Sequence, residues 1–180
     1  MSHSAVKIFT IGHSTRTIEN FIEMLRSQAV EALVDVRKMP KSRKNPQFSD
    51  EALARSLGDA GIEYRRMDGL GGLRRARKDS VNTGWRNASF RGYADYMQSA
   101  EFDSALGELI QLGGTKRVAI MCAEAVPWRC HRTLIADALT ARGVEVEHVM
   151  GVGKKHSHRM TPFARVNGTR VEYGDPKPLA

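Results

Sequence analysis

The 180-residue sequence contains only two cysteines, Cys122 and Cys130, and it lacks the segments that mark membrane and secreted proteins. Two thiols do not build the disulfide framework that stabilises small secreted domains. No uninterrupted apolar run approaches the roughly 18 residues that a membrane span requires. Residues 1–7 have no apolar stretch typical of a secretory signal. We therefore expect a cytoplasmic protein that does not contact a membrane.

Acidic residues are scarce relative to basic ones: 20 Asp and Glu stand against 28 Lys and Arg, which gives a formal net charge of +8. Residues 37–44 are basic without an acid, and residues 65–91 are rich in arginine. Such a charge distribution attracts anions, and the planar guanidinium group suits phosphate. The expected partner is a phosphate-bearing small molecule or a nucleic acid. A solvated basic surface is the competing interpretation, and the oligomeric state stays open.

Short β-rich runs alternate with segments of helical periodicity, a pattern typical of a mostly parallel sheet flanked by helices. We expect an α/β fold with about five strands, at residues 6–11, 32–36, 62–67, 117–122 and 144–149. Helices are expected at residues 18–25, 49–61, 93–97, 102–112 and 130–142. Glycines and clustered charges predict an irregular loop over residues 68–89.

The C-terminal part of the sequence differs from this alternating pattern. Asn167-Gly168, flanked by β-rich residues 163–166 and 169–173, predicts a β-hairpin. We therefore expect one α/β domain over residues 7–151 and a C-terminal extension with a hairpin over residues 152–180.

Polar residues follow the expected strands at the point where each strand ends. Open parallel sheets bind ligands at the carboxyl ends of their strands, so we expect these side chains to meet in one pocket. The candidate catalytic residues are His13, Asp35, Cys122, Glu124 and His131. The candidate substrate-binding residues are Ser14, Arg37, Arg43, Tyr64, Gly71, Gly72, Arg91, Tyr93, Arg129 and Arg132.

Cys122 ends an apolar strand and precedes a helix whose N-terminus would stabilise a thiolate, with Arg129 and Arg132 adding positive charge. Rhodaneses and cysteine phosphatases place their nucleophile in such a turn, although the spacing to Arg129 is one residue longer here than in the phosphatase loop. The alternative is a small buried cysteine that only ends the strand. Cys122, Cys130 and His131 have poor spacing for a metal, so we expect no metal and no cofactor.

The other candidates also have structural alternatives. His13 can act as a general base or bind an anion, or it can join two loops. Asp35 and Arg37 lie on the same side of their strand, which suits an ion pair that orients a catalytic group or a purely structural pair. Aromatic residues such as Tyr64 and Tyr93 among the basic residues can stack on bases or dock the loop on the core.

The order of these motifs resembles the domain of unknown function 488 (DUF488) family over about residues 7–151. The matching segments are Thr10-Ile11-Gly12-His13-Ser14, Val34-Asp35-Val36-Arg37, Leu70-Gly71-Gly72, Arg91-Gly92-Tyr93-Ala94, Met121-Cys122-Ala123-Glu124 and Cys130-His131-Arg132. The resemblance implies a compact α/β protein of bacterial type and supports the candidate residues above. It supplies no reaction.

Three functional hypotheses follow from the residues. The first is an enzyme, a hydrolase or a transferase, that acts on a phosphate-bearing substrate such as a nucleotide or nucleic acid. In it, arginines hold the phosphate and Asp35, Glu124 or His13 moves a proton. The second is a nucleic-acid-binding accessory module without chemistry. The third is a thiol enzyme that uses Cys122.

Overall fold

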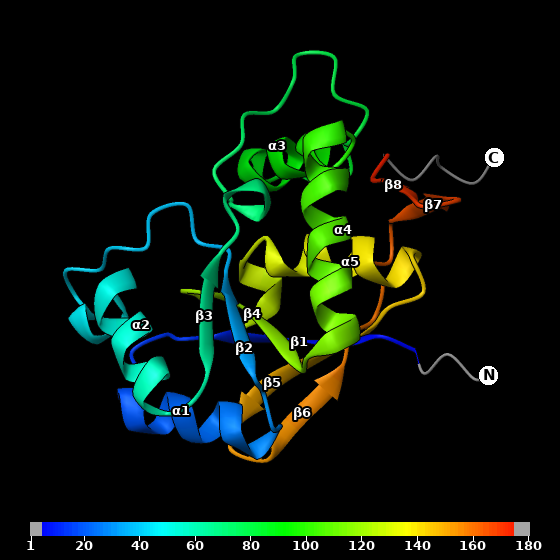
Figure 1. Ribbon diagram of the computed structural model, residues 1–180. Coiled ribbons are helices and arrows are strands. Elements are labelled where there is room, and N and C mark those ends of the chain that lie inside the picture. The colour runs from blue at the N-terminus through cyan, green and yellow to red at the C-terminus, as the bar shows by residue number, and fades with distance from the viewer. Residues whose placement is uncertain (1–4, 175–180) are drawn as a thin grey trace.

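A six-stranded sheet forms the centre of the computed structural model, which describes residues 5–174 (Figure 1). Its strand order is β3-β2-β4-β1-β5-β6, and the first five strands are parallel, whereas β6 runs antiparallel to β5. The strands are β1 (Lys7–Gly12), β2 (Ala32–Asp35), β3 (Glu63–Arg66), β4 (Val118–Cys122), β5 (Glu145–Gly151) and β6 (Lys154–Ser157).

Helices cover both faces of the sheet (Figure 1). One face carries α1 (Ile18–Ser27) and α2 (Asp50–Asp59), and the other carries α3 (Ala88–Tyr96), α4 (Ala100–Thr115) and α5 (Arg132–Ala141). Successive strand residues point to opposite faces, so Ile8 joins the core under α4 and α5 while Phe9 joins the core under α1. Three short 3-10 helices lie in the connections between the described strands and helices: η1 (Pro46–Phe48), η2 (Asp68–Leu70) and η3 (Pro127–Arg129).

The start of α1 shows how local sequence sets a helix boundary. The hydroxyl of Thr17 accepts a hydrogen bond from the backbone N–H of Asn20 at 3.1 Å, which satisfies one of the free amides of the first turn. Phe21 and Leu25, one turn apart, are buried against the sheet. Both features agree with the predicted helix.

The expected α/β fold and C-terminal hairpin are confirmed. The hairpin consists of β7 (Arg165–Asn167) and β8 (Arg170–Glu172), which pair as a separate two-stranded sheet. The structure adds β6, which the sequence analysis missed because all four of its residues are exposed and show no apolar alternation. It also starts α3 at Ala88 instead of at residue 93, since Asn87 caps the helix through its side-chain oxygen.

The long segment between η2 and α3 is anchored by the carboxylate of Asp95. This group accepts hydrogen bonds from the Ser80 hydroxyl at 2.6 Å, the Asn82 side-chain amide at 2.7 Å and the backbone N–H of Arg77 at 2.7 Å. The backbone N–H of Tyr173, just after β8, donates to Asn82 at 3.0 Å. The C-terminal extension therefore packs on the α/β core, and residues 175–180 lie outside the described residues.

Within residues 5–174, no helix combines the length and the apolar character needed to cross a bilayer.

Candidate functional site

The backbones that follow β1 and β4 continue to pair beyond the strand ends. The backbone N–H of His13 donates to the Cys122 carbonyl at 3.0 Å, and that of Ser14 donates to the Ala123 carbonyl at 2.9 Å. Gly12 allows this approach, because a Cβ atom there would lie 1.7 Å from the carbonyl oxygen of Glu124. His13 and Cys122 are thus brought to the same end of the sheet, as the strand-end argument predicts.

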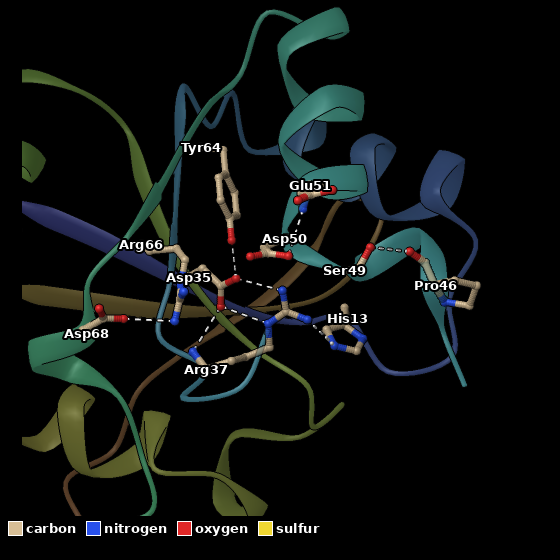
Figure 2. Close-up of polar contacts among 10 residues, drawn as sticks. All are labelled: His13, Asp35, Arg37, Pro46, Ser49, Asp50, Glu51, Tyr64, Arg66 and Asp68. Carbon is tan, nitrogen blue, oxygen red and sulfur yellow. Dashed lines mark hydrogen bonds and ion pairs between the residues drawn. The ribbon is translucent and has the colours of Figure 1, made fainter. Parts of the chain in front are cut away.

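A buried ion pair between Asp35 and Arg37 organises this end of the sheet (Figure 2). Asp35 Oδ1 accepts from the Arg37 backbone N–H at 3.0 Å and from Arg37 Nε at 2.9 Å. Asp35 Oδ2 accepts from Arg37 Nη2 at 2.7 Å and from the Tyr64 hydroxyl at 2.6 Å. Four donors use the acceptor capacity of this carboxylate. The geometry therefore makes Asp35 a positioning group for Arg37.

His13 lies on the other side of the Arg37 guanidinium (Figure 2). Its Nδ1 is 2.8 Å from the Ser14 carbonyl oxygen, so Nδ1 carries the proton, and its Nε2 accepts from Arg37 Nη1 at 3.3 Å. The ring stacks on Phe48 with centroids 4.5 Å apart. Burial lowers the pKa of His13, and the charge of Arg37 adds to this effect. His13 is a neutral imidazole that helps to hold Arg37.

Two cavities adjoin at this end of the sheet and share Arg37, Met39 and Ala123 in their walls. The first, which we call the thiol cavity, has a volume of about 320 Å³ and includes Cys122 and Phe90 in its lining.

The second, which we call the basic cavity, has a volume of about 440 Å³. Its lining includes Lys41, Arg43 and Lys44. A ligand that spans both cavities would therefore meet a thiol, an apolar wall and several cations.

Cys122 lies against a buried arginine. Its Sγ accepts from Arg132 Nε at 3.0 Å, and Arg132 is fully buried. The other guanidinium nitrogens donate to the Thr10 hydroxyl at 3.1 Å and to the Glu124 carbonyl at 2.8 Å, and neither partner is a carboxylate. A guanidinium group stays protonated, and a buried charge requires an opposite charge nearby. A thiolate at Cys122 would supply that charge.

The surrounding groups favour ionisation of Cys122 alone. Burial would raise the pKa of Cys122, but a hydrogen bond with Cys130 and the positive charge of Arg132 outweigh it and lower the pKa to about 7. Burial and the contact with Cys122 raise the pKa of Cys130 well above its usual value. Burial lowers the pKa of His131 to about 4, and its Nε2 donates to the Val36 carbonyl at 3.0 Å. Above about pH 7 these shifts favour one thiolate, at Cys122, beside one thiol and one neutral imidazole.

The structure distributes the predicted site residues over several positions. The thiol cavity collects Arg37, Gly72, Tyr93, Cys122, Glu124, Arg129 and His131, and the basic cavity collects His13, Ser14, Arg37 and Arg43.

The remaining candidates lie outside both linings. Asp35 and Tyr64 support Arg37, and Arg132 lies beneath Cys122. Gly71 accepts a hydrogen bond from Arg74, and Arg91 donates to the backbone of Trp85.

Sequence reasoning did not select Thr10 or Lys38 as site residues. Lys38 lines the thiol cavity and belongs to the basic run that the sequence analysis noted, so its charge was an available signal. Thr10 is an uncharged residue within a buried strand. Its contact with Arg132 joins residues 122 positions apart, which no local pattern indicates.

No group of three or more His, Cys, Asp or Glu side chains in the described part of the chain could hold a metal ion. The fold and the site define a parallel-sheet α/β protein with an arginine-paired thiol at the carboxyl end of a central strand. The family model described as domain of unknown function DUF488 matches residues 17–139, more than half of the chain, and the chain belongs to this family. No curated protein and no solved structure matches the chain.

Proposed function

We propose that this protein is a thiol enzyme, a hydrolase or transferase that uses Cys122 as a nucleophile on a phosphate-bearing substrate. The observation that carries the proposal is the 3.0 Å contact between Cys122 Sγ and the Nε of the fully buried Arg132. This contact favours the thiolate, which is the nucleophilic form of cysteine. The proposal thus joins a reactive thiol with the phosphate-bearing substrate that the basic sequence predicts.

The two adjoining cavities support a division of roles. Lys41, Arg43 and Lys44 of the basic cavity attract the anionic group of the substrate. Arg37, held by Asp35 on one side, borders both cavities and is placed to orient that group between them. Leu73 and Phe90 give the thiol cavity apolar walls for the uncharged part of the substrate.

The proposed reaction has two displacements at phosphorus. In the first, the sulfur lone pair of Cys122 forms an S–P bond while the P–O bond to the leaving group breaks, and the leaving oxygen takes its electron pair and a proton from water. In the second, a water molecule or another hydroxyl forms a new P–O bond, the S–P bond breaks and the thiolate returns. The proton of the attacking group passes to solvent.

Alkylation of Cys122 by two reagents of similar size tests the proposal. Iodoacetate is anionic and iodoacetamide is neutral, so basic residues beside a thiolate attract only iodoacetate. The ratio of the iodoacetate rate to the iodoacetamide rate should therefore be higher for Cys122 than for a free cysteine. We expect the double variant Lys41→Ala/Arg43→Ala to remove most of this preference. Inorganic phosphate should protect Cys122 from both reagents, and peptide mass spectrometry separates Cys122 from Cys130.

The covalent step has its own test. After mixing with an aryl phosphate and rapid quenching in acid, we expect a phosphorylated Cys122 peptide, and Cys122→Ser should abolish turnover. A ratio of iodoacetate to iodoacetamide reactivity no higher than that of a free cysteine, or turnover that persists in Cys122→Ser, would overturn the proposal. Cys130→Ser is the matched control because it changes the other buried thiol and keeps a hydroxyl that can donate to Cys122.

The competing proposal is a nucleic-acid-binding module without chemistry, and the basic cavity is the observation that favours it. This alternative predicts affinity for DNA or RNA that falls steeply as salt rises and that does not depend on Cys122. Binding measured in Cys122→Ser, together with the absence of a phosphorylated intermediate, would favour the module over the enzyme.

A further inference from the structure

A third and larger cavity, of about 650 Å³, lies outside the two described above and shares none of their lining residues. It lies beside η3, the start of α5 and residues 156–162. We call it the tryptophan cavity, because both tryptophans of the chain, Trp85 and Trp128, line it. Its volume falls in the range of pockets that bind small organic molecules.

Two histidines of its wall are held in a chain of hydrogen bonds. His158 Nε2 lies 2.7 Å from the buried carboxylate of Asp137, and His158 Nδ1 lies 2.9 Å from His148 Nε2. His148 Nδ1 lies 2.6 Å from the hydroxyl of Thr10, which accepts from Arg132 at 3.1 Å. Both nitrogens of each imidazole therefore have a hydrogen-bond partner in this chain.

Because their nitrogens are occupied and their side chains are buried, His148 and His158 form a fixed part of the cavity wall and offer no free hydrogen-bonding edge. Burial lowers the pKa of His148 to about 3, which keeps its ring uncharged. Trp128 is 60% exposed and adds a large ring that packing does not cover. Aromatic surface of this kind favours a planar, unsaturated ligand.

Polar features of the same wall point to a ligand that is also an anion with acceptor atoms. The indole Nε1 of Trp85 is buried and has no hydrogen-bond partner among residues 5–174, so a ligand acceptor that reached it would satisfy it. Arg159 is exposed at the cavity, and none of the described residues that line the cavity is acidic. The ligand therefore needs a flat ring that packs on the aromatic surface and a negative charge that pairs with Arg159.

We propose that the tryptophan cavity binds a mononucleotide, with the base stacked on Trp128 and the phosphate on Arg159. A nucleobase is planar, carries acceptor atoms that suit the free indole donor, and is joined to an anion at a distance of one sugar. The site is distinct from Cys122 and does not depend on the function proposed above.

Intrinsic tryptophan fluorescence tests this proposal directly, because both tryptophans of the chain line the cavity. The full-length protein is titrated with AMP, with adenosine, which lacks the phosphate, and with ribose 5-phosphate, which lacks the base. We expect AMP to change the fluorescence with saturation, and each fragment to bind more weakly. Trp128→Ala should weaken AMP binding by about 10- to 100-fold, with Trp85 left as the reporter, whereas Trp128→Phe should restore much of it.

Two further variants separate the parts of the proposal. Arg159→Ala should reduce the affinity for AMP to that for adenosine. Lys41→Ala/Arg43→Ala, which changes only the basic cavity, should leave the AMP titration unchanged. The proposal is overturned if AMP causes no saturable change, if ribose 5-phosphate binds as well as AMP, or if Trp128→Ala binds AMP as the unaltered protein does. A loss in Lys41→Ala/Arg43→Ala would place AMP in the basic cavity and would likewise overturn it.

Discussion

Replacing Cys122 by serine should make the free energy of unfolding respond differently to pH. The substitution removes the anionic partner of the buried Arg132 guanidinium. Removing one partner of a buried ion pair lowers the free energy of unfolding by about 3–5 kcal/mol, whereas replacing a small uncharged buried side chain lowers it by less. The difference between the two proteins should be large only where the Cys122 thiol of the native protein is ionised.

The magnitude follows from the pKa of Cys122, which folding lowers from 9.0 to about 7. A group whose pKa falls on folding stabilises the native state above its unfolded pKa, and this contribution is lost as the pH falls through the folded pKa. Between about pH 6 and about pH 8.5 the native protein should therefore gain about 2 kcal/mol relative to Cys122→Ser. Other titrating groups are common to both proteins and cancel in the comparison.

Urea unfolding monitored by tryptophan fluorescence, at several pH values across this window, measures the effect. Cys130→Ser is the matched control, since burial raises the pKa of Cys130 and keeps it protonated throughout. Cys130→Ser should retain an increase in stability with pH. A stability difference between the native protein and Cys122→Ser that stays constant with pH would refute the assignment of a thiolate to Cys122.

Three further predictions concern the supporting structure, and all are read from unfolding experiments. Gly12→Ala should destabilise the protein by at least about 3 kcal/mol, because the new Cβ would lie 1.7 Å from a backbone carbonyl oxygen. Gly107→Ala is the control: Gly107 lies in helix α4 with open space around it, so this substitution should stabilise the protein by about 0.5–1 kcal/mol. Equal effects of the two substitutions would contradict the close approach of the backbone at Gly12. Tyr64→Phe removes a donor to the Asp35 carboxylate and should cost about 1.5–3 kcal/mol, whereas a cost near zero would mean that the carboxylate is not held by this hydroxyl. Burial lowers the pKa of His148 to about 3, so between about pH 6.5 and about pH 3 a proton binds to His148 only in the unfolded chain. The free energy of unfolding should therefore fall as the pH falls through this range. His148→Gln should reduce this pH dependence by up to about 1.4 kcal/mol per pH unit.

The sequence predicted the parallel sheet because its strands are short apolar runs between amphipathic helices. It missed β6, whose pairing to β5 depends on backbone hydrogen bonds and leaves its side chains exposed. Strand-end reasoning also brought His13 and Cys122 to one end of the sheet, and the structure places them there.

The roles within the site were harder to predict from sequence. Alternation along a strand suggested the pair of Asp35 and Arg37, but the third partner, Tyr64, comes from a neighbouring strand 29 residues away. The sequence offered two arginines, Arg129 and Arg132, as partners of Cys122. In the structure Arg132 contacts the thiol, whereas Arg129 lines the thiol cavity. Contacts between distant residues decide such roles, and local patterns do not record them.

The pH dependence of Cys122 alkylation by iodoacetamide tests the central claim most directly. The rate is followed by mass spectrometry of the Cys122 peptide in the native protein, and an unfolded sample gives the reference. Pairing with Arg132 predicts that the rate rises with a midpoint near pH 7, as the pKa of Cys122 requires. A midpoint near about pH 8.5, the value of an ordinary free thiol, would contradict it.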